Sequence, residues 1–148
     1  MSYEIITDSA SNLTRDLLEK YNIRMISYKV TIDGEDYDCY DPDRDYARAG
    51  KDFYDKMRNG AKVSTSLLNT ACFTDFFTPI LESGKDIIFV GISSGLSGTV
   101  QAARIAAEDL EEEFPGRRVM VIDSLGASLG EGLLVIELSG LRAHGVPM

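Results

Sequence analysis

The 148-residue chain is poor in cysteine, histidine and positive charge, and each shortage excludes a class of function. Two cysteines, Cys39 and Cys72, cannot build a disulfide framework, and with the single histidine, His144, they leave no Cys/His set for zinc. Fifteen basic against 24 acidic residues give a net charge of −9. A surface this negative repels phosphate backbones and anionic lipid faces. We therefore predict no metal, no cofactor and no nucleic-acid partner.

Long apolar runs are also missing. The longest are IIFVGI at 87–92 and LLVIEL at 133–138, whereas a membrane-spanning helix needs about 20 apolar residues. The N-terminal MSYEIITDS has neither a basic region nor an apolar stretch of the kind found in secretory signals. Hydrophobic residues make up 44% of the chain and charged residues 26%, which is ordinary for a globular domain. We expect one domain without a membrane span and a cytoplasmic location.

Strand and helix patterns alternate along the chain. Apolar or β-branched runs predict strands at 4–7, 24–32, 86–92 and 118–122, and Asp33-Gly34 predicts a β-hairpin turn. Amphipathic or apolar segments predict helices at 14–20, 46–58, 70–83, 99–113 and 130–145. Strands that alternate with helices imply crossover connections and a parallel sheet covered on both faces. The predicted fold is α/β: three layers, α/β/α, with a central parallel sheet of about four strands plus a small β-hairpin.

Hydroxyl-rich loops follow the predicted strands. They occupy 7–12, 93–99 and 123–128, and Ser-Thr-Ser at 64–66 precedes another helix; none contains lysine or arginine. A single loop of this kind is explained by helix capping, but several at one sheet edge exceed that need. Ligands of open α/β sheets bind at this edge, and helix N-termini attract anions without a cationic side chain. The sequence therefore predicts a pocket for a small anion such as a carboxylate, with Gly95 and Gly98 allowing close backbone approach.

Named motifs leave one alternative open. The phosphate-binding pattern GxxxxGK[ST] and the dinucleotide pattern GxGxxG are both absent. Gly91-Ile-Ser-Ser-Gly95, however, matches the GxSxG nucleophile elbow, and Ser93, Asp123 and His144 occur in the order of an α/β-hydrolase triad. A small serine hydrolase or esterase that uses Ser93 is thus the alternative function.

Four blocks of the sequence closely resemble the DegV family. They are TDSASNL at 7–13, STSLLN at 64–69, ISSGLSGTVQAA at 92–103 and VIDSLGASLGEG at 121–132. The resemblance implies a bacterial cytosolic protein that binds long-chain fatty acids. It also implies that the protein is no enzyme itself but presents the fatty-acid carboxylate to a separate fatty-acid kinase, which makes an acyl-phosphate for phospholipid synthesis.

The resemblance also implies site residues. Thr65 and Ser97 look like the hydroxyls that hold the carboxylate, with the Gly98 backbone beside them. Secondary polar contacts are expected from neighbouring hydroxyls, namely Ser9, Ser64, Ser66, Ser93, Ser94, Thr99 and Ser124. The acyl chain is expected in a tunnel lined by the apolar faces of 70–83, 99–113 and 133–143. Leu67-Leu68 stand where the family pattern has Gln-Pro.

Members of the family are about twice as long as this chain. A second α/β domain closes over their ligand and supplies a basic residue and a histidine near the head group. We therefore expect residues 1–148 to be the N-terminal fatty-acid-binding domain, with the C-terminal domain absent and His144 no substitute for the missing histidine. Weak ligand binding and dimerisation through the exposed face where the second domain docks are expected consequences.

Overall fold

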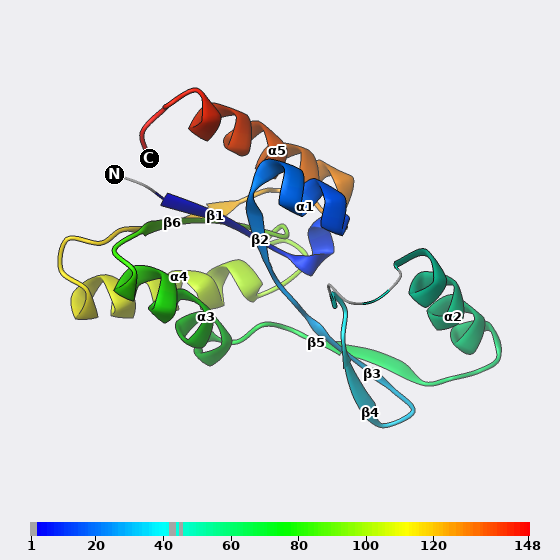
Figure 1. Cartoon of the computed structure of the whole chain (residues 1–148). Helices are drawn as coiled ribbons and strands as arrows, with labels where there is room; N and C mark the ends of the chain where they lie inside the picture. The colour runs from blue at the N-terminus through cyan, green and yellow to red at the C-terminus, as the bar shows by residue number, and fades with distance from the viewer. Residues whose placement is uncertain (1–2, 42–43, 45) are drawn as a thin grey trace.

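Four parallel strands form the centre of the computed structural model, which describes residues 3–41, 44 and 46–148 (Figure 1). Their order across the sheet is β2-β1-β6-β7. The strands are β1 (Tyr3–Asp8), β2 (Ile23–Ile26), β6 (Asp86–Gly91) and β7 (Val119–Asp123). Every residue of β6 is buried, which explains its unbroken apolar run, because a central parallel strand is covered on both faces.

Helices cover both faces of this sheet, so the three-layer α/β prediction is confirmed. One face packs against α3 (Thr70–Glu82) and α4 (Thr99–Glu113), and the other against α1 (Arg15–Tyr21) and α5 (Leu129–Ala143). The α3/α4 side is centred on three fully buried rings, Phe73, Phe77 and Phe89, with centroids 5.0–6.0 Å apart. Aromatic packing of this kind adds to the burial of apolar area. No described helix has the length and apolar character needed to cross a bilayer.

A second sheet lies beside the first and is larger than the predicted hairpin. It is antiparallel, in the order β4-β3-β5, with β3 (Lys29–Ile32), β4 (Glu35–Asp38) and β5 (Val63–Ser66). Asp33 and Gly34 turn β3 into β4 with positive φ angles of 51° and 92°, as the Asp-Gly signal predicted. The prediction that 64–66 is a loop before a helix was wrong, because these residues pair with β3 as a strand.

The single strand predicted over 24–32 was also wrong, since the run divides between the two sheets. β2 ends at Ile26 in the parallel sheet, and β3 begins at Lys29 in the antiparallel one. Between them, side-chain hydroxyls take over the backbone hydrogen bonding: Ser9 Oγ accepts from the Tyr28 N–H at 3.0 Å, and Ser27 Oγ accepts from the Tyr40 N–H at 2.8 Å. The β-branched pattern favours strand throughout and contains no signal for the change of sheet.

The remaining elements flank the carboxyl edge of the parallel sheet. A short 3-10 turn, η1 (Ser9–Ser11), follows β1 directly. Helix α2 (Tyr46–Arg58) connects the two outer strands β4 and β5 and stands away from the parallel sheet (Figure 1). This arrangement leaves a hollow bounded by α2, the antiparallel sheet and the carboxyl edge of the parallel sheet.

Candidate functional site

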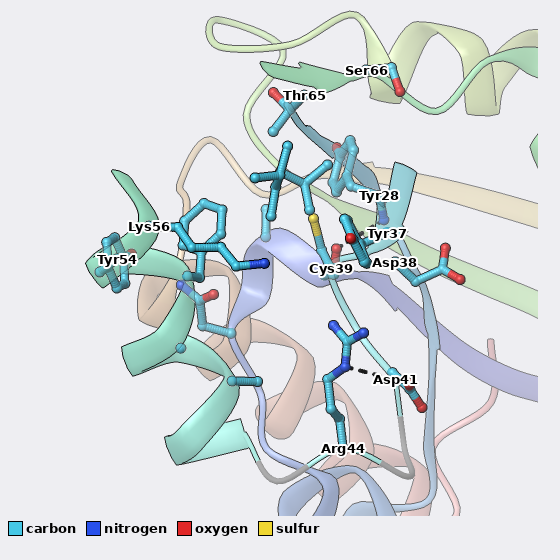
Figure 2. A pocket seen from close by; sticks show the side chains of 18 of the residues that line it. Tyr28, Tyr37, Asp38, Cys39, Asp41, Arg44, Tyr54, Lys56, Thr65 and Ser66 are labelled. Carbon is cyan, nitrogen blue, oxygen red and sulfur yellow. Dashed lines mark hydrogen bonds and ion pairs between the residues drawn. The ribbon is translucent and has the colours of Figure 1, made fainter. Parts of the chain in front are cut away.

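A cavity of about 1390 Å³ occupies this hollow. Small-molecule pockets usually measure about 300–1,000 Å³, so the space is ample for a long ligand. Residues from three regions line it: the η1 turn and the β6–α4 loop, the antiparallel sheet, and α2. Figure 2 shows the Lys56 side chain extending from α2 into the cavity, with Tyr28 and Thr65 on another wall.

The three residues expected to hold the head group lie on the wall of this one cavity. Thr65 comes from β5, whereas Ser97 and Gly98 come from the loop before α4. Thr65 is the ladder partner of Val30, and cross-strand partners project to the same face, so both line the cavity. Gly98 is the N-cap of α4, and in the described part of the chain no group accepts a hydrogen bond from its N–H. We call the part of the wall formed by Thr65, Ser97 and Gly98 the head-group corner. It combines two hydroxyls with the positive end of a 15-residue helix.

One arrangement of the hydrogen bonds around Ser97 leaves its hydroxyl proton available to a ligand. The Tyr28 hydroxyl donates to Thr99 Oγ1 at 2.8 Å, and Thr99 Oγ1 lies 2.9 Å from Ser97 Oγ. The Thr99 N–H also donates to Ser97 Oγ, at 3.3 Å. When Tyr28 donates to Thr99 and Thr99 donates to Ser97, both acceptor positions of Ser97 Oγ are filled. Ser97 is then a donor toward the cavity, which suits a carboxylate.

Tyr28 was missed by the sequence reasoning, although it lines the cavity and begins this chain of hydroxyls. Burial and the charge of Asp8 raise the pKa of the Tyr28 phenol far above its ordinary value, so the group remains a donor at any physiological pH. Its only sequence signal was an aromatic residue inside a strand run, and such a residue normally indicates core packing.

The secondary hydroxyls divide into two groups. Ser9 and Ser66 line the cavity with the three principal residues. The others do not, namely Ser64, Ser93, Ser94, Thr99 and Ser124. Thr99 is fully buried beneath Ser97, and the Ser124 hydroxyl donates to the Gly126 carbonyl at 3.2 Å, so both act within the protein.

The residues of the hydrolase alternative are not brought together. His144 follows α5, and nearby the Val146 carbonyl accepts a hydrogen bond from Tyr3 at the amino end of β1. Ser93 follows β6 at the opposite, carboxyl edge of the sheet. The rise per residue of an extended strand places the two edges, and so Ser93 and His144, about 15 Å or more apart. Hydrogen bonds from Ser94 and Leu125, not from a histidine, lower the pKa of Asp123. The GxSxG match therefore marks a loop and no triad.

The apolar part of the cavity wall differs from the prediction. None of the lining residues comes from 70–83, 99–113 or 133–143, because the buried faces of those helices pack against the parallel sheet. The apolar wall instead consists of side chains from the antiparallel sheet, α2 and the adjoining loops: Val30, Ile32, Phe53, Tyr54, Leu67, Ile92 and Leu96. The exposed side chain of Leu67 forms part of this wall, whereas that of its neighbour Leu68 is buried in the core.

Cations also line the cavity. Arg44, Arg48 and Lys56 contribute to it, and the charges of Arg44 and Lys56 lie 5.8 and 5.7 Å from the centre of the Tyr37 ring. Arg44 also pairs with Asp41 at 3.8 Å (Figure 2). Sequence reasoning placed Arg48 and Lys56 on the helix predicted over 46–58 and Arg44 in the loop before it, and did not connect them with the site.

Two fully buried carboxyl groups lie behind the cavity wall. Asp8 accepts hydrogen bonds from the Ala10 N–H at 2.9 Å and the Ile92 N–H at 3.0 Å. Glu131, in the first turn of α5, accepts one from the Thr7 hydroxyl at 2.8 Å. Burial, followed by the charge of Asp8, raises the pKa of Glu131 to about 8, and burial also raises that of Asp8. Because Asp8 has two backbone donors, it carries the charge near neutral pH and Glu131 keeps a proton.

Comparison with known proteins gives consistent matches over the whole chain. A family model described as that of uncharacterised proteins of the DegV family matches residues 2–148. The DegV domain-containing protein YteA of Lactococcus lactis is 33% identical over 145 residues, which is 98% of this chain and 49% of YteA. A DegV domain-containing protein of Streptococcus pyogenes is 32% identical over 98% of this chain and half of its own length.

Solved structures match equally well. A fatty-acid-binding DegV family protein of Thermus thermophilus is similar with a TM-score of 0.83 and 32% identity, covering 100% of this chain and 50% of that one. A stearic-acid-binding protein of Eubacterium ventriosum gives a TM-score of 0.85 at 25% identity, covering 99% of this chain and 49% of that one. The chain thus spans about half the length of the proteins it matches.

Proposed function

The chain belongs to the DegV family, and from this premise we propose that it binds the carboxylate of a long-chain fatty acid at Thr65, Ser97 and Gly98. The observation that carries the proposal is that these three residues line a single cavity of about 1390 Å³. Two similar structures are described as fatty-acid-binding and stearic-acid-binding proteins, which supports a fatty acid as the ligand.

The chemistry of the corner favours a single carboxylate. Two hydroxyl donors and the α4 N-terminus provide hydrogen bonds and a partial positive charge without a fixed cation. Hydrogen bonds to an ionised group contribute about 1.5–3 kcal/mol each. The acyl chain would lie against the apolar wall formed by β3, α2 and Leu67, where it is removed from water.

The role of the whole protein is part of the same proposal. We infer a non-catalytic carrier in the cytoplasm that presents the bound carboxylate to a separate fatty-acid kinase. An open cavity edge at the carboxyl ends of the strands fits such a presentation. The test is to add a fatty-acid kinase and ATP to the loaded protein: acyl-phosphate formation that needs this chain supports the role, and formation at the same rate without it contradicts the role.

Dimerisation is a further part of the proposal. Large apolar side chains are exposed near the carboxyl edge, including Leu96, Leu125, Leu129 and Leu133. Exposed apolar surface of this kind favours association. Sedimentation velocity over a hundredfold concentration range should show a shift from monomer to dimer, whereas a constant monomer would contradict it.

Ligand binding is tested by titrating the chain with a fluorescent long-chain fatty acid. Thr65→Ala and Ser97→Ala should each weaken binding about tenfold or more, because each removes a donor to an ionised group. Ser64→Ala is the matched control, since Ser64 precedes Thr65 in β5 but does not line the cavity. Unchanged affinity in both site variants would overturn the head-group assignment. A mass spectrum of ligand extracted from the intact protein would identify the natural fatty acid.

A further inference from the structure

The buried pair Asp8 and Glu131 has more hydrogen-bonding capacity than partners. Glu131 is 0% exposed, and its Oε2 atom has no hydrogen-bond partner within the described part of the chain. Buried polar atoms are nearly always paired, so an unpaired carboxyl oxygen requires an explanation. Neutralisation by a proton supplies one, because an isolated buried carboxylate is far more costly than a carboxylic acid and because the interaction with Asp8, which raises the pKa of Glu131, gives that proton an acceptor.

Among the described residues, no positively charged group acts on the pair to offset a second negative charge. The groups around the pair come from three segments. Thr7 and Asp8 belong to β1, the Tyr28 phenol comes from the segment between β2 and β3, and the Ile92 N–H comes from the loop after β6. Of these groups only Asp8 and Tyr28 titrate. None of the ion pairs among the described residues includes Asp8 or Glu131.

The pair is connected to the head-group corner. The backbone N–H groups of Ala10 and Ile92 donate hydrogen bonds to Asp8, and both of these residues line the cavity. The charges of Asp8 and Glu131 also act on the Tyr28 hydroxyl, which is two hydrogen bonds away from Ser97. A ligand carboxylate beside Ser97 would therefore add a negative charge near a pair that already carries one.

We propose that Glu131 is a positioning residue for the head-group site, and that it must hold a proton for a carboxylate ligand to bind there. This inference rests on the proposed fatty-acid binding. With Glu131 neutral, the wall beneath Ser9, Ala10 and Ile92 contains one charge, which backbone N–H groups already solvate. With Glu131 ionised, two buried charges repel the ligand, and they also repel each other across the elements that form the wall.

The experiment is the pH dependence of affinity for a fluorescent long-chain fatty acid, measured between pH 6.5 and 9.5. The carboxyl group of the monomeric fatty acid is ionised over this whole pH range. The pKa of about 8 for Glu131 places the change inside this range, so binding should be about tenfold weaker at pH 9 than at pH 7. Glu131→Gln, which is neutral at every pH and still offers an oxygen to the Thr7 hydroxyl, should bind equally well across the range.

Glu137→Gln is the matched control, because Glu137 lies on the exposed side of the same helix. It should keep the wild-type pH profile. A flat wild-type profile, or the same slope in Glu131→Gln, would overturn the role of Glu131 while leaving fatty-acid binding intact. Absence of binding in the wild-type protein at pH 6.5 would instead overturn the proposed function, and the inference with it.

Discussion

Replacing Glu131 with glutamine should make the protein more stable as the pH rises, relative to wild type. The folded-state pKa of Glu131 is about 8, against an ordinary value of 4.5. The folded protein therefore holds a proton that the unfolded chain has released, and wild-type stability falls as the pH rises between these values. Each pH unit in this window corresponds to about 1.4 kcal/mol, so the loss between pH 5 and pH 8 approaches about 4 kcal/mol. Glutamine has no proton to lose.

Urea unfolding at pH 5, 6, 7, 8 and 9 measures this difference. The unfolding free energy of Glu131→Gln minus that of wild type should increase steadily with pH and level off above about pH 8. Glu137→Gln, exposed on the same helix, should give a constant difference. A constant difference for Glu131→Gln as well would refute the view that this side chain is protonated in the folded protein.

Three other changes test separate parts of the structure. Tyr28→Phe should weaken fatty-acid binding about fivefold, which is the value of one neutral hydrogen bond, and should not affect the binding of a fatty alcohol of equal length. Titration with both ligands measures this, and equal losses of affinity would contradict the role of the hydroxyl chain. Gly132→Ala should lower the unfolding free energy by about 1–3 kcal/mol, because its Cβ would lie 2.9 Å from Leu13 Cδ2; an unchanged urea midpoint would count against this packing. Ser93→Ala should leave any trace of p-nitrophenyl ester turnover unaltered, whereas loss of the turnover in this variant would revive the hydrolase alternative.

Local patterns predicted most of the parallel sheet and its helices. The unbroken apolar run of β6 and the Asp33-Gly34 turn each have one favoured structure, so residue type alone decides them. The hydroxyl loops at the strand ends predicted a pocket at the carboxyl edge of the sheet, and Ser97 and Gly98 line a cavity there.

The antiparallel sheet and the cavity wall depended on tertiary contacts that no local pattern contains. Ser27 and Tyr28 redirect the chain through hydrogen bonds to residues distant in sequence, so a continuous β-branched run did not reveal the break. Thr65 reaches the site as part of a strand, because β5 pairs with β3 across more than thirty residues. Glu131 gave no such signal, because its i, i+4, i+8 stripe with Val135 and Ser139 contains one apolar residue, and only the structure shows all three to be buried.

The location of the ligand carboxylate is the most direct test of the account. In amide NMR spectra of the ¹⁵N-labelled chain, a long-chain fatty acid should shift Thr65, Ser97 and Gly98 most strongly, and the fatty alcohol of equal length should shift them much less. Large shifts confined to the shallow depression around Leu18 and Arg24, with Ser97 and Gly98 unmoved, would contradict a head-group site at the start of α4.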